Sequence, residues 1–368
     1  MRSVIAFVKK NTVLCIAILA ALVTSFIVKP DKEYLGYFDL KTLTCLFSVL
    51  AVVCALKNIN FFYTLAEKIV SVTGNIRVCI LTLVSITFIG SMLIANDMAL
   101  LTFLPLGYFV LSTTDKKKYM SFTFIMQNIA ANLGGMLTPF GNPQNLYLYT
   151  KFNIPTGEFV KIMILPFVIS IALILGLCYF FVKPEKITIK NEDVHTDKKR
   201  TVIYLILFAI SILIVFRGIP YYVGLALILP SIFILDRRAL AKVDYPLLLT
   251  FVAFFIFSGN MARIGAVREF FGLLMEKNTL LFSVLSCQVI SNVPSAILLS
   301  QFTGNYTELL LGVNIGGVGT LISSLASLIT LREFTLHNPL ETKRYIVKFS
   351  AFNFAFLFLL TGIMLFVV

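Results

Sequence analysis

NLGGMLTPFGNPQN, residues Asn132 to Asn145, interrupts a long apolar sequence with three asparagines, three glycines and two prolines. Apolar segments flank this stretch on both sides. In lipid, non-helical backbone survives only where protein buries it or where it lines a polar cavity, because unpaired backbone groups are costly there. The glycines allow close backbone approach, and Pro139 and Pro143 prevent the helix from re-forming. The stretch therefore predicts a transmembrane helix that is opened in its middle at a binding site.

The composition of the whole chain is that of a membrane protein. Of its 368 residues, 58% are hydrophobic and 13% are charged, and the mean hydropathy is +0.93. A soluble domain carries about 25% charged residues. The net charge of +13 fits Lys and Arg gathered in cytoplasmic loops, so we expect a lipid bilayer and no nucleic acid as partner. The expected fold class is an all-α, polytopic membrane protein.

Enzyme chemistry has no support in the sequence. The six cysteines are scattered through apolar segments without a C-x-x-C pair, and His195 and His337 lie in or near polar loops. No P-loop and no pairing of a nucleophile with a base at membrane depth stands out. We therefore expect a protein that is not an enzyme and that has no cofactor.

A membrane helix needs about 20 apolar residues, and this length divides the chain into continuous and interrupted segments. Continuous spans are predicted at 12–28, 38–56, 157–182, 201–217, 220–236, 245–260 and 345–368. Interrupted segments are predicted at 78–112 (near Asn96-Asp97), 119–150 (near 137–144), 279–303 (near Asn292) and 307–331 (near Gly316 to Ser324). The mixed segments 58–74 and 262–277 are typical of amphipathic helices at the membrane interface.

These elements occur twice in the same order, and the local sequences agree. ANDMALLTFLP (95–105) parallels SNVPSAILLSQ (291–301). NLGGMLTPFGNPQNL (132–146) shares five of fifteen residues with NIGGVGTLISSLASL (314–328), including a Gly-Gly pair. The chain is therefore predicted to contain two repeats, each with a helical hairpin and a discontinuous transmembrane helix.

The distribution of Lys and Arg predicts how the repeats are oriented. If the hairpins at about 78–112 and 279–303 are re-entrant and the N-terminus is cytoplasmic, most loop Lys and Arg residues fall in cytoplasmic loops. Each repeat then crosses the membrane an even number of times, and one helix separates them, so the repeats are inverted. The predicted organisation is a first repeat at 1–182 with its broken helix at about 119–150, a cytoplasmic linker at 183–200, and a connecting helix plus second repeat at 201–368 with its broken helix at about 307–331. The protein is placed in the cytoplasmic (inner) membrane, with an extracytoplasmic C-terminus.

The interrupted segments supply groups that bind ions. Half-helix N-termini attract anions, whereas half-helix C-termini and unwound carbonyls offer oxygen atoms to cations. The predicted substrate-binding residues are Asn96, Asn142, Asn145, Ser291, Asn292, Thr320 and Ser324. The residues predicted to couple a cation are Asp97, Asn132, Gly134, Thr138, Gly141, Asn314, Gly316 and Gly319. An intramembrane carboxylate marks a functional site by default, so Na⁺ is a candidate ligand at Asn96, Asp97 and Asn292.

These motifs resemble the ion transporter superfamily, which includes divalent anion:sodium symporters, citrate carriers, arsenite permeases and NhaD-type sodium/proton antiporters. The symporters carry Ser-Asn-Thr at both hairpin tips, where this chain has Ala95-Asn96-Asp97 and Ser291-Asn292-Val293. The stretch 138–145 looks like their Gly-Thr-Pro-Pro-Asn region, whereas ANDMALL (95–101) and SLASL (324–328) look more like arsenite permeases. The resemblance implies an elevator carrier in which hairpins and broken helices move against a scaffold, and it implies a homodimer.

The expected function is secondary active transport of a small anion, a carboxylate or an inorganic oxyanion, coupled to Na⁺ or H⁺. A Na⁺/H⁺ antiporter that uses Asp97 is one alternative, and an arsenite or antimonite efflux permease is another. A channel is disfavoured by the matched repeats. The sequence leaves the substrate, the coupling ion and the direction of transport open.

Overall fold

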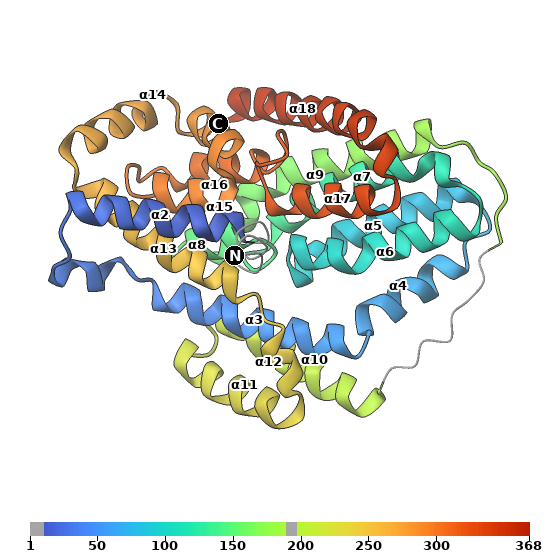
Figure 1. The fold of residues 1–368 in the computed structure, drawn as a ribbon, viewed down its shortest axis with the longest axis horizontal. Helices are drawn as coiled ribbons and strands as arrows, with labels where there is room; N and C mark the ends of the chain where they lie inside the picture. The colour runs from blue at the N-terminus through green and yellow to red at the C-terminus, as the bar shows by residue number, and fades with distance from the viewer. Residues whose placement is uncertain (1–10, 189–196) are drawn as a thin grey trace.

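The structure, a computed structural model, describes residues 11–188 and 197–368, and the named elements in these ranges are helices (Figure 1). Residues 1–10 of the predicted first repeat and 189–196 of the predicted linker lie outside the described residues. Six of the described helices are long and apolar enough to cross a membrane. They are α3 (Leu40–Asn58), α5 (Ile76–Ile94), α9 (Thr156–Phe181), α13 (Tyr245–Arg263), α14 (Gly265–Ile290) and α18 (Thr342–Val367).

Three further helices complete the predicted continuous spans. They are α2 (Thr12–Ile27), α10 (Lys198–Val215) and α11 (Tyr221–Leu235). The ends of all the predicted continuous spans agree with the observed helix ends to within three residues. The prediction of an all-α, polytopic membrane protein is confirmed.

Both predicted hairpins turn at a residue with positive φ. In the first, α5 and α6 (Asn96–Thr113) meet at Ala95, which has φ 67° and ψ 151°. In the second, the end of α14 and α15 (Asn292–Leu299) meet at Ser291, which has φ 75° and ψ 159°. This backbone region is populated almost only by glycine and costs about 1–3 kcal/mol per residue, so it persists only where surrounding contacts impose it. The two hairpin tips share this uncommon conformation.

Each predicted broken helix consists of two helices separated by an irregular segment. The first consists of α7 (Met120–Gly134) and α8 (Pro143–Lys151), and the second of α16 (Tyr306–Ile315) and α17 (Leu325–His337). Pro143 is the first residue of α8, where its missing N–H removes no helical hydrogen bond. The first break therefore falls at glycine and proline residues, and the second falls at glycine residues.

The segments with mixed polarity form short helices beside the hairpins. Residues 58–74 contain α4 (Phe61–Ser71), which connects α3 to the first hairpin. Residues 262–277 contain the end of α13 and the first part of α14, and a non-helical Asn278 (φ −169°, ψ 94°) separates this part from the hairpin arm that follows. The remaining short helix, α12 (Arg237–Ala241), precedes α13.

Contacts between the helices define two groups, a hairpin group and a flanking group. In the hairpin group, α5 and α6 pack against α7, and α14 and α15 pack against α16. Each hairpin also reaches the other broken helix, because α6 packs against α17 and α15 against α8. In the flanking group, α2 packs against α13, and α3 packs against α10, α11, α12 and α13. The groups meet where α3 packs against α8 and α13 against α15.

The first residues of the predicted linker are attached to the base of the first hairpin. The backbone N–H of Ile76 donates a hydrogen bond to the carbonyl oxygen of Glu185 (2.9 Å), and the Glu185 carboxylate pairs with Lys116 and Lys118, both at 2.6 Å. Hydrogen bonds from Lys116, Lys118 and Tyr119 lower the pKa of Glu185 to about 2. This part of the linker is therefore bound to the hairpin group.

Candidate functional site

Asparagine side chains connect the two broken helices at the centre of the hairpin group. The Asn96 amide donates to Oδ1 of Asn132 (3.3 Å). The Asn142 amide donates to the carbonyl oxygen of Asn132 and to Oδ1 of Asn314, both at 3.3 Å. The Asn314 amide in turn donates to Oδ1 of Asn145 (2.6 Å). All five residues are buried, so these predicted site residues form one connected network.

The second hairpin tip lies beside this network. The backbone N–H of Asn292 and the Ser291 hydroxyl both donate to the carbonyl oxygen of Ser323, at 2.9 and 3.2 Å. A Cβ added at Gly317 would lie 3.1 Å from the Asn292 amide nitrogen and 3.6 Å from Oδ1 of Asn132. The two predicted asparagines from opposite halves of the chain are therefore neighbours across the backbone of Gly317.

The two hairpin tips make the same local hydrogen bond. Oδ1 of Asn96 accepts from the backbone N–H of Asp97, and Oδ1 of Asn292 accepts from that of Val293, each at 2.9 Å. The first backbone N–H groups of a helix have no intrahelical partner. The two tips therefore share one geometry, in which each asparagine side chain accepts a hydrogen bond from the first turn of its own helix.

Two threonines attach the breaks to the hairpins in the same way. The Thr138 hydroxyl donates to the carbonyl oxygen of Met92 (2.7 Å), and the Thr320 hydroxyl donates to that of Gln288 (3.1 Å). Met92 lies four residues before Asn96, just as Gln288 lies four residues before the second tip asparagine. The contact geometry thus follows the correspondence between the two halves that their sequences predict.

The predicted glycines are positions where backbone segments approach closely. A Cβ at Gly134 would collide with the carbonyl oxygen of Phe88, and one at Gly316 would lie 2.8 Å from Cβ and Sγ of Cys287. A Cβ at Gly141 would collide with the carbonyl oxygen of Gly135. Gly319 has φ +124°, a conformation that L side chains rarely adopt. The breaks are thus packed tightly onto the hairpin arms.

Some of the predicted site residues hold the breaks in shape. The Asn145 amide donates to the carbonyl oxygens of Gly135, Met136 and Thr138 at 3.2–3.3 Å. Oγ of Ser324 accepts from the backbone N–H of Ser327 (3.3 Å) and caps α17. These contacts fix the shape of the irregular segments. As a result, α6 and α15 begin at the hairpin tips, and α8 and α17 begin at the breaks.

The network predicts a measurable coupling between its two halves. Asn145→Ala and Asn314→Ala each remove one hydrogen-bond partner of a buried amide, and each is expected to destabilise the protein by about 1–3 kcal/mol. The double variant is expected to cost less than the sum, because the partners contact each other at 2.6 Å. The wild type, the two single variants and the double variant form a double-mutant cycle, which thermal unfolding in detergent measures. Additive effects of the two substitutions would contradict a direct contact.

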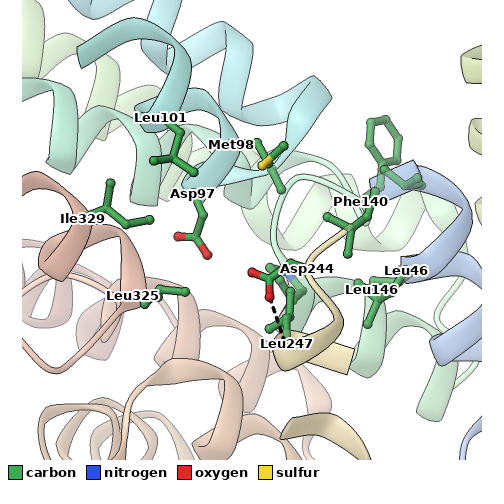
Figure 2. Close-up of a pocket in the computed structure, with 14 residues that line it drawn as sticks. Leu46, Asp97, Met98, Leu101, Phe140, Leu146, Asp244, Leu247, Leu325 and Ile329 are labelled. Atoms are coloured by element: carbon green, nitrogen blue, oxygen red, sulfur yellow. Dashed lines mark hydrogen bonds between the residues drawn. The ribbon is translucent and has the colours of Figure 1, made fainter. Parts of the chain in front are cut away.

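Asp97 lies outside the asparagine network. Its side chain points into a cavity of about 60 Å³ between the hairpin and flanking groups (Figure 2). This volume has room for a small number of water molecules. Asp244, from the start of α13, faces Asp97 across this space, and the other described lining residues are apolar except for the backbone of the tip. Neither Asn96 nor Asn292 is among the described residues that line it.

The Asp97 carboxylate has an unused oxygen. Its Oδ1 is shielded from solvent and has no hydrogen-bond partner among the described residues. Burying a charged or polar group without a partner is costly. The sequence predicted a functional role for Asp97 but not for Asp244. In the sequence, Asp244 has the pattern of a helix N-cap in the polar loop before Pro246.

Comparison with known proteins places the chain among transporters. A family model described as citrate transporter (CitMHS) matches residues 4–307, which include both hairpins and the first broken helix. An uncharacterized transporter, MJ0456, from Methanocaldococcus jannaschii is 35% identical over 308 residues, which cover 83% of this chain and 84% of the relative. The inner membrane protein YbiR of Escherichia coli K12 is 29% identical over 318 residues, 83% of each chain.

The match covers most of the chain and includes the hairpin tips, the first break and every residue of the buried asparagine network except Asn314. Its description agrees with an all-α membrane protein whose described residues contain six helices long enough to span a bilayer. The protein is therefore a transporter that belongs to the citrate transporter family (CitMHS).

Proposed function

We propose that the protein carries a small anion, a carboxylate or an inorganic oxyanion, across the cytoplasmic membrane and couples its movement to Na⁺ or H⁺. The observation that carries this proposal is the arrangement of four helix starts, those of α6, α8, α15 and α17, at the tips and breaks around the asparagine network. Helix N-termini carry a partial positive charge and free N–H groups, which favour anions. The family description, citrate transporter, makes a carboxylate the first substrate to test.

The proposed anion site uses neutral groups. The hairpin tips contribute Asn96, Ser291 and Asn292, and the breaks contribute Asn142 and Thr320. Asn145, Asn314 and Ser324 hold the breaks that present these groups. No Lys or Arg lies in 132–145 or 314–328, so helix ends and amide groups would replace a salt bridge. Such a site releases its anion more readily than a buried ion pair would.

The proposed transport movement is a displacement of the hairpin group relative to the flanking group. The broken helices and both hairpins are joined by buried hydrogen bonds, which favour their moving as one body. The boundary with the flanking group is largely apolar around the cavity, and such a surface slides without breaking many hydrogen bonds. An elevator movement of two inverted repeats is consistent with this division.

A Na⁺/H⁺ antiporter is the second candidate, because one observation favours it. The cavity at the group boundary is lined by two carboxylates and, among the described residues, by no basic side chain. A carboxylate in such a place binds cations or protons in turn. The antiporter would transport Na⁺ and H⁺ without any anion.

Uptake by liposomes separates these functions. The purified protein is reconstituted, and uptake of labelled citrate, succinate, sulfate and phosphate is recorded with an inward Na⁺ gradient, an inward proton gradient or neither. We expect gradient-dependent uptake of at least one anion. Asn292→Ala is expected to reduce it by about tenfold to a hundredfold, the equivalent of one lost buried amide contact.

Asn260→Ala is the matched control. Asn260 is as buried as Asn292, but it lies in α13 and donates to Thr24 and Ser25 within the flanking group. Its replacement should leave the dependence on the gradient unchanged. Absence of anion uptake, together with collapse of an internal acid load on addition of Na⁺, would contradict the anion proposal and support the antiporter.

A further inference from the structure

We propose that Asp244 is a second coupling-cation residue, which binds an alkali cation together with Asp97 across the boundary between the hairpin and flanking groups. This inference rests on the proposed function, because it adds a ligand to the cation site of the same carrier. It assigns a role to a residue outside the breaks and hairpins. The ligand class is Na⁺, held by oxygen atoms.

The geometry brings the two carboxylates to one cavity. Asp97 comes from the first turn of α6, at the tip of the first hairpin, and Asp244 from the residue before α13. Both line the cavity of about 60 Å³, and Figure 2 shows their carboxylates pointing toward one another across it. The space suits a cation that keeps a few water molecules.

The surroundings make a cation at this place favourable. Leu46, Leu101, Leu247, Leu325 and Ile329 are among the apolar side chains that line the cavity. Two carboxylates that face such a cavity without a basic partner repel each other and lose solvation. A bound cation relieves both costs, and the Asp97 carboxylate is available to bind it because its Oδ1 has no hydrogen-bond partner among the described residues.

One carboxylate oxygen of Asp244 is not used by the helix cap. Its Oδ1 accepts a hydrogen bond from the backbone N–H of Leu247 (3.0 Å) and so caps α13. The second oxygen, Oδ2, is not needed for the cap. Asparagine caps helices as well as aspartate does, so Asp244→Asn keeps the cap and removes only the charge.

The position of Asp244 links the pair to one position of the carrier. Asp244 belongs to the end of the flanking group where the Asn58 amide donates to Asp236 (2.9 Å) and the Lys242 ammonium donates to Asn58 (2.7 Å). The distribution of basic residues predicts that this end is cytoplasmic. Asp97 moves with the hairpin group, so the pair forms only when the hairpin tip lies at this end. The cation is then held by both residues on the cytoplasmic side and by Asp97 alone after the movement.

Thermal stabilisation by Na⁺ alone tests the pair. The full-length protein in detergent is heated in increasing NaCl, with choline chloride keeping the ionic strength constant. We expect NaCl to stabilise the wild type, and Asp244→Asn to raise the half-stabilising NaCl concentration by about tenfold, which corresponds to about 1.4 kcal/mol of binding free energy. Asp97→Asn should remove the effect.

Asp236→Asn is the control, because Asp236 caps α12 in the same way but does not line the cavity. It should retain the wild-type response to NaCl. If Asp244→Asn and the wild type respond equally to NaCl, or if NaCl does not stabilise the wild type, the proposal that Asp97 and Asp244 bind a cation together is wrong.

The anion proposal fails separately from this inference. If labelled anions are not taken up but Asp244→Asn still weakens stabilisation by NaCl, the cation pair stands and the anion carrier falls. If Na⁺ drives anion uptake while Asp244→Asn responds to NaCl as the wild type does, the carrier stands and the pair falls.

Discussion

Asp97→Asn is expected to abolish cation-coupled transport while the protein still folds. The substitution keeps the shape of the side chain and the backbone N–H that donates to Asn96, but it removes the negative charge at the cavity. Removing one partner of a buried ionic contact costs about 3–5 kcal/mol, which corresponds to a loss of roughly a hundredfold or more in cation affinity. Initial uptake rates in liposomes under a Na⁺ gradient measure this loss.

The fold of this variant provides its own control. The unpartnered Oδ1 of Asp97 makes no hydrogen bond to other described residues, so replacing the carboxylate removes no internal contact of that atom. We expect the variant to unfold at a temperature close to that of the wild type in choline chloride. Gradient-driven uptake at the wild-type rate by a folded Asp97→Asn protein would exclude a coupling role for this residue.

Gly134→Ala and Gly316→Ala are expected to prevent the broken helices from packing on their hairpins. A methyl group at Gly134 would collide with the carbonyl oxygen of Phe88, and backbone cannot move aside as a flexible side chain can. At Gly316, the added atom would lie 2.8 Å from the Cys287 side chain and 2.8 Å from the carbonyl oxygen of Gly312. Overpacking of this kind costs about 1–3 kcal/mol or more, and it displaces the break that carries the site.

Gly176→Ala is the matched control for these two substitutions. Gly176 lies inside α9 with nothing within 4 Å of an added Cβ, so alanine there should stabilise the helix by up to about 1 kcal/mol. Thermal unfolding followed by size-exclusion chromatography compares the three variants. A Gly134→Ala protein as stable as Gly176→Ala would contradict the close approach of α7 to α5.

Glycine, proline and asparagine made the breaks predictable from the sequence. Pro143 cannot continue a helix from α7, and the Gly-Gly pairs cannot be explained by lipid-facing packing, so the interruptions at 135–142 and 316–324 follow from local chemistry. The continuous spans follow from their length and hydropathy. The predicted helix ends differ from the observed ends by up to three residues, because capping and the conformation of the last turn depend on tertiary contacts.

The partners of the polar side chains were not predictable. Aligning the two halves matches Asn132 with Asn314, yet nothing in either stretch indicates that Asn314 donates to Asn145 in the opposite half. Asp244 is an ordinary helix cap in the sequence, and only the packing of α13 beside the first hairpin tip brings it to the cavity. The local amino-acid sequence determines where a transmembrane helix is interrupted. The tertiary fold determines which side chains face the interruption.

Accumulation of substrate against its concentration gradient is the most direct test of whether the protein is a carrier that uses a cation gradient. Liposomes containing the wild-type protein are given a labelled carboxylate and an inward Na⁺ or proton gradient. We predict an internal concentration of the carboxylate above the external one, which falls to equality when an ionophore dissipates the cation gradient. Entry that stops at equal concentrations, at a rate that neither gradient changes, would contradict it.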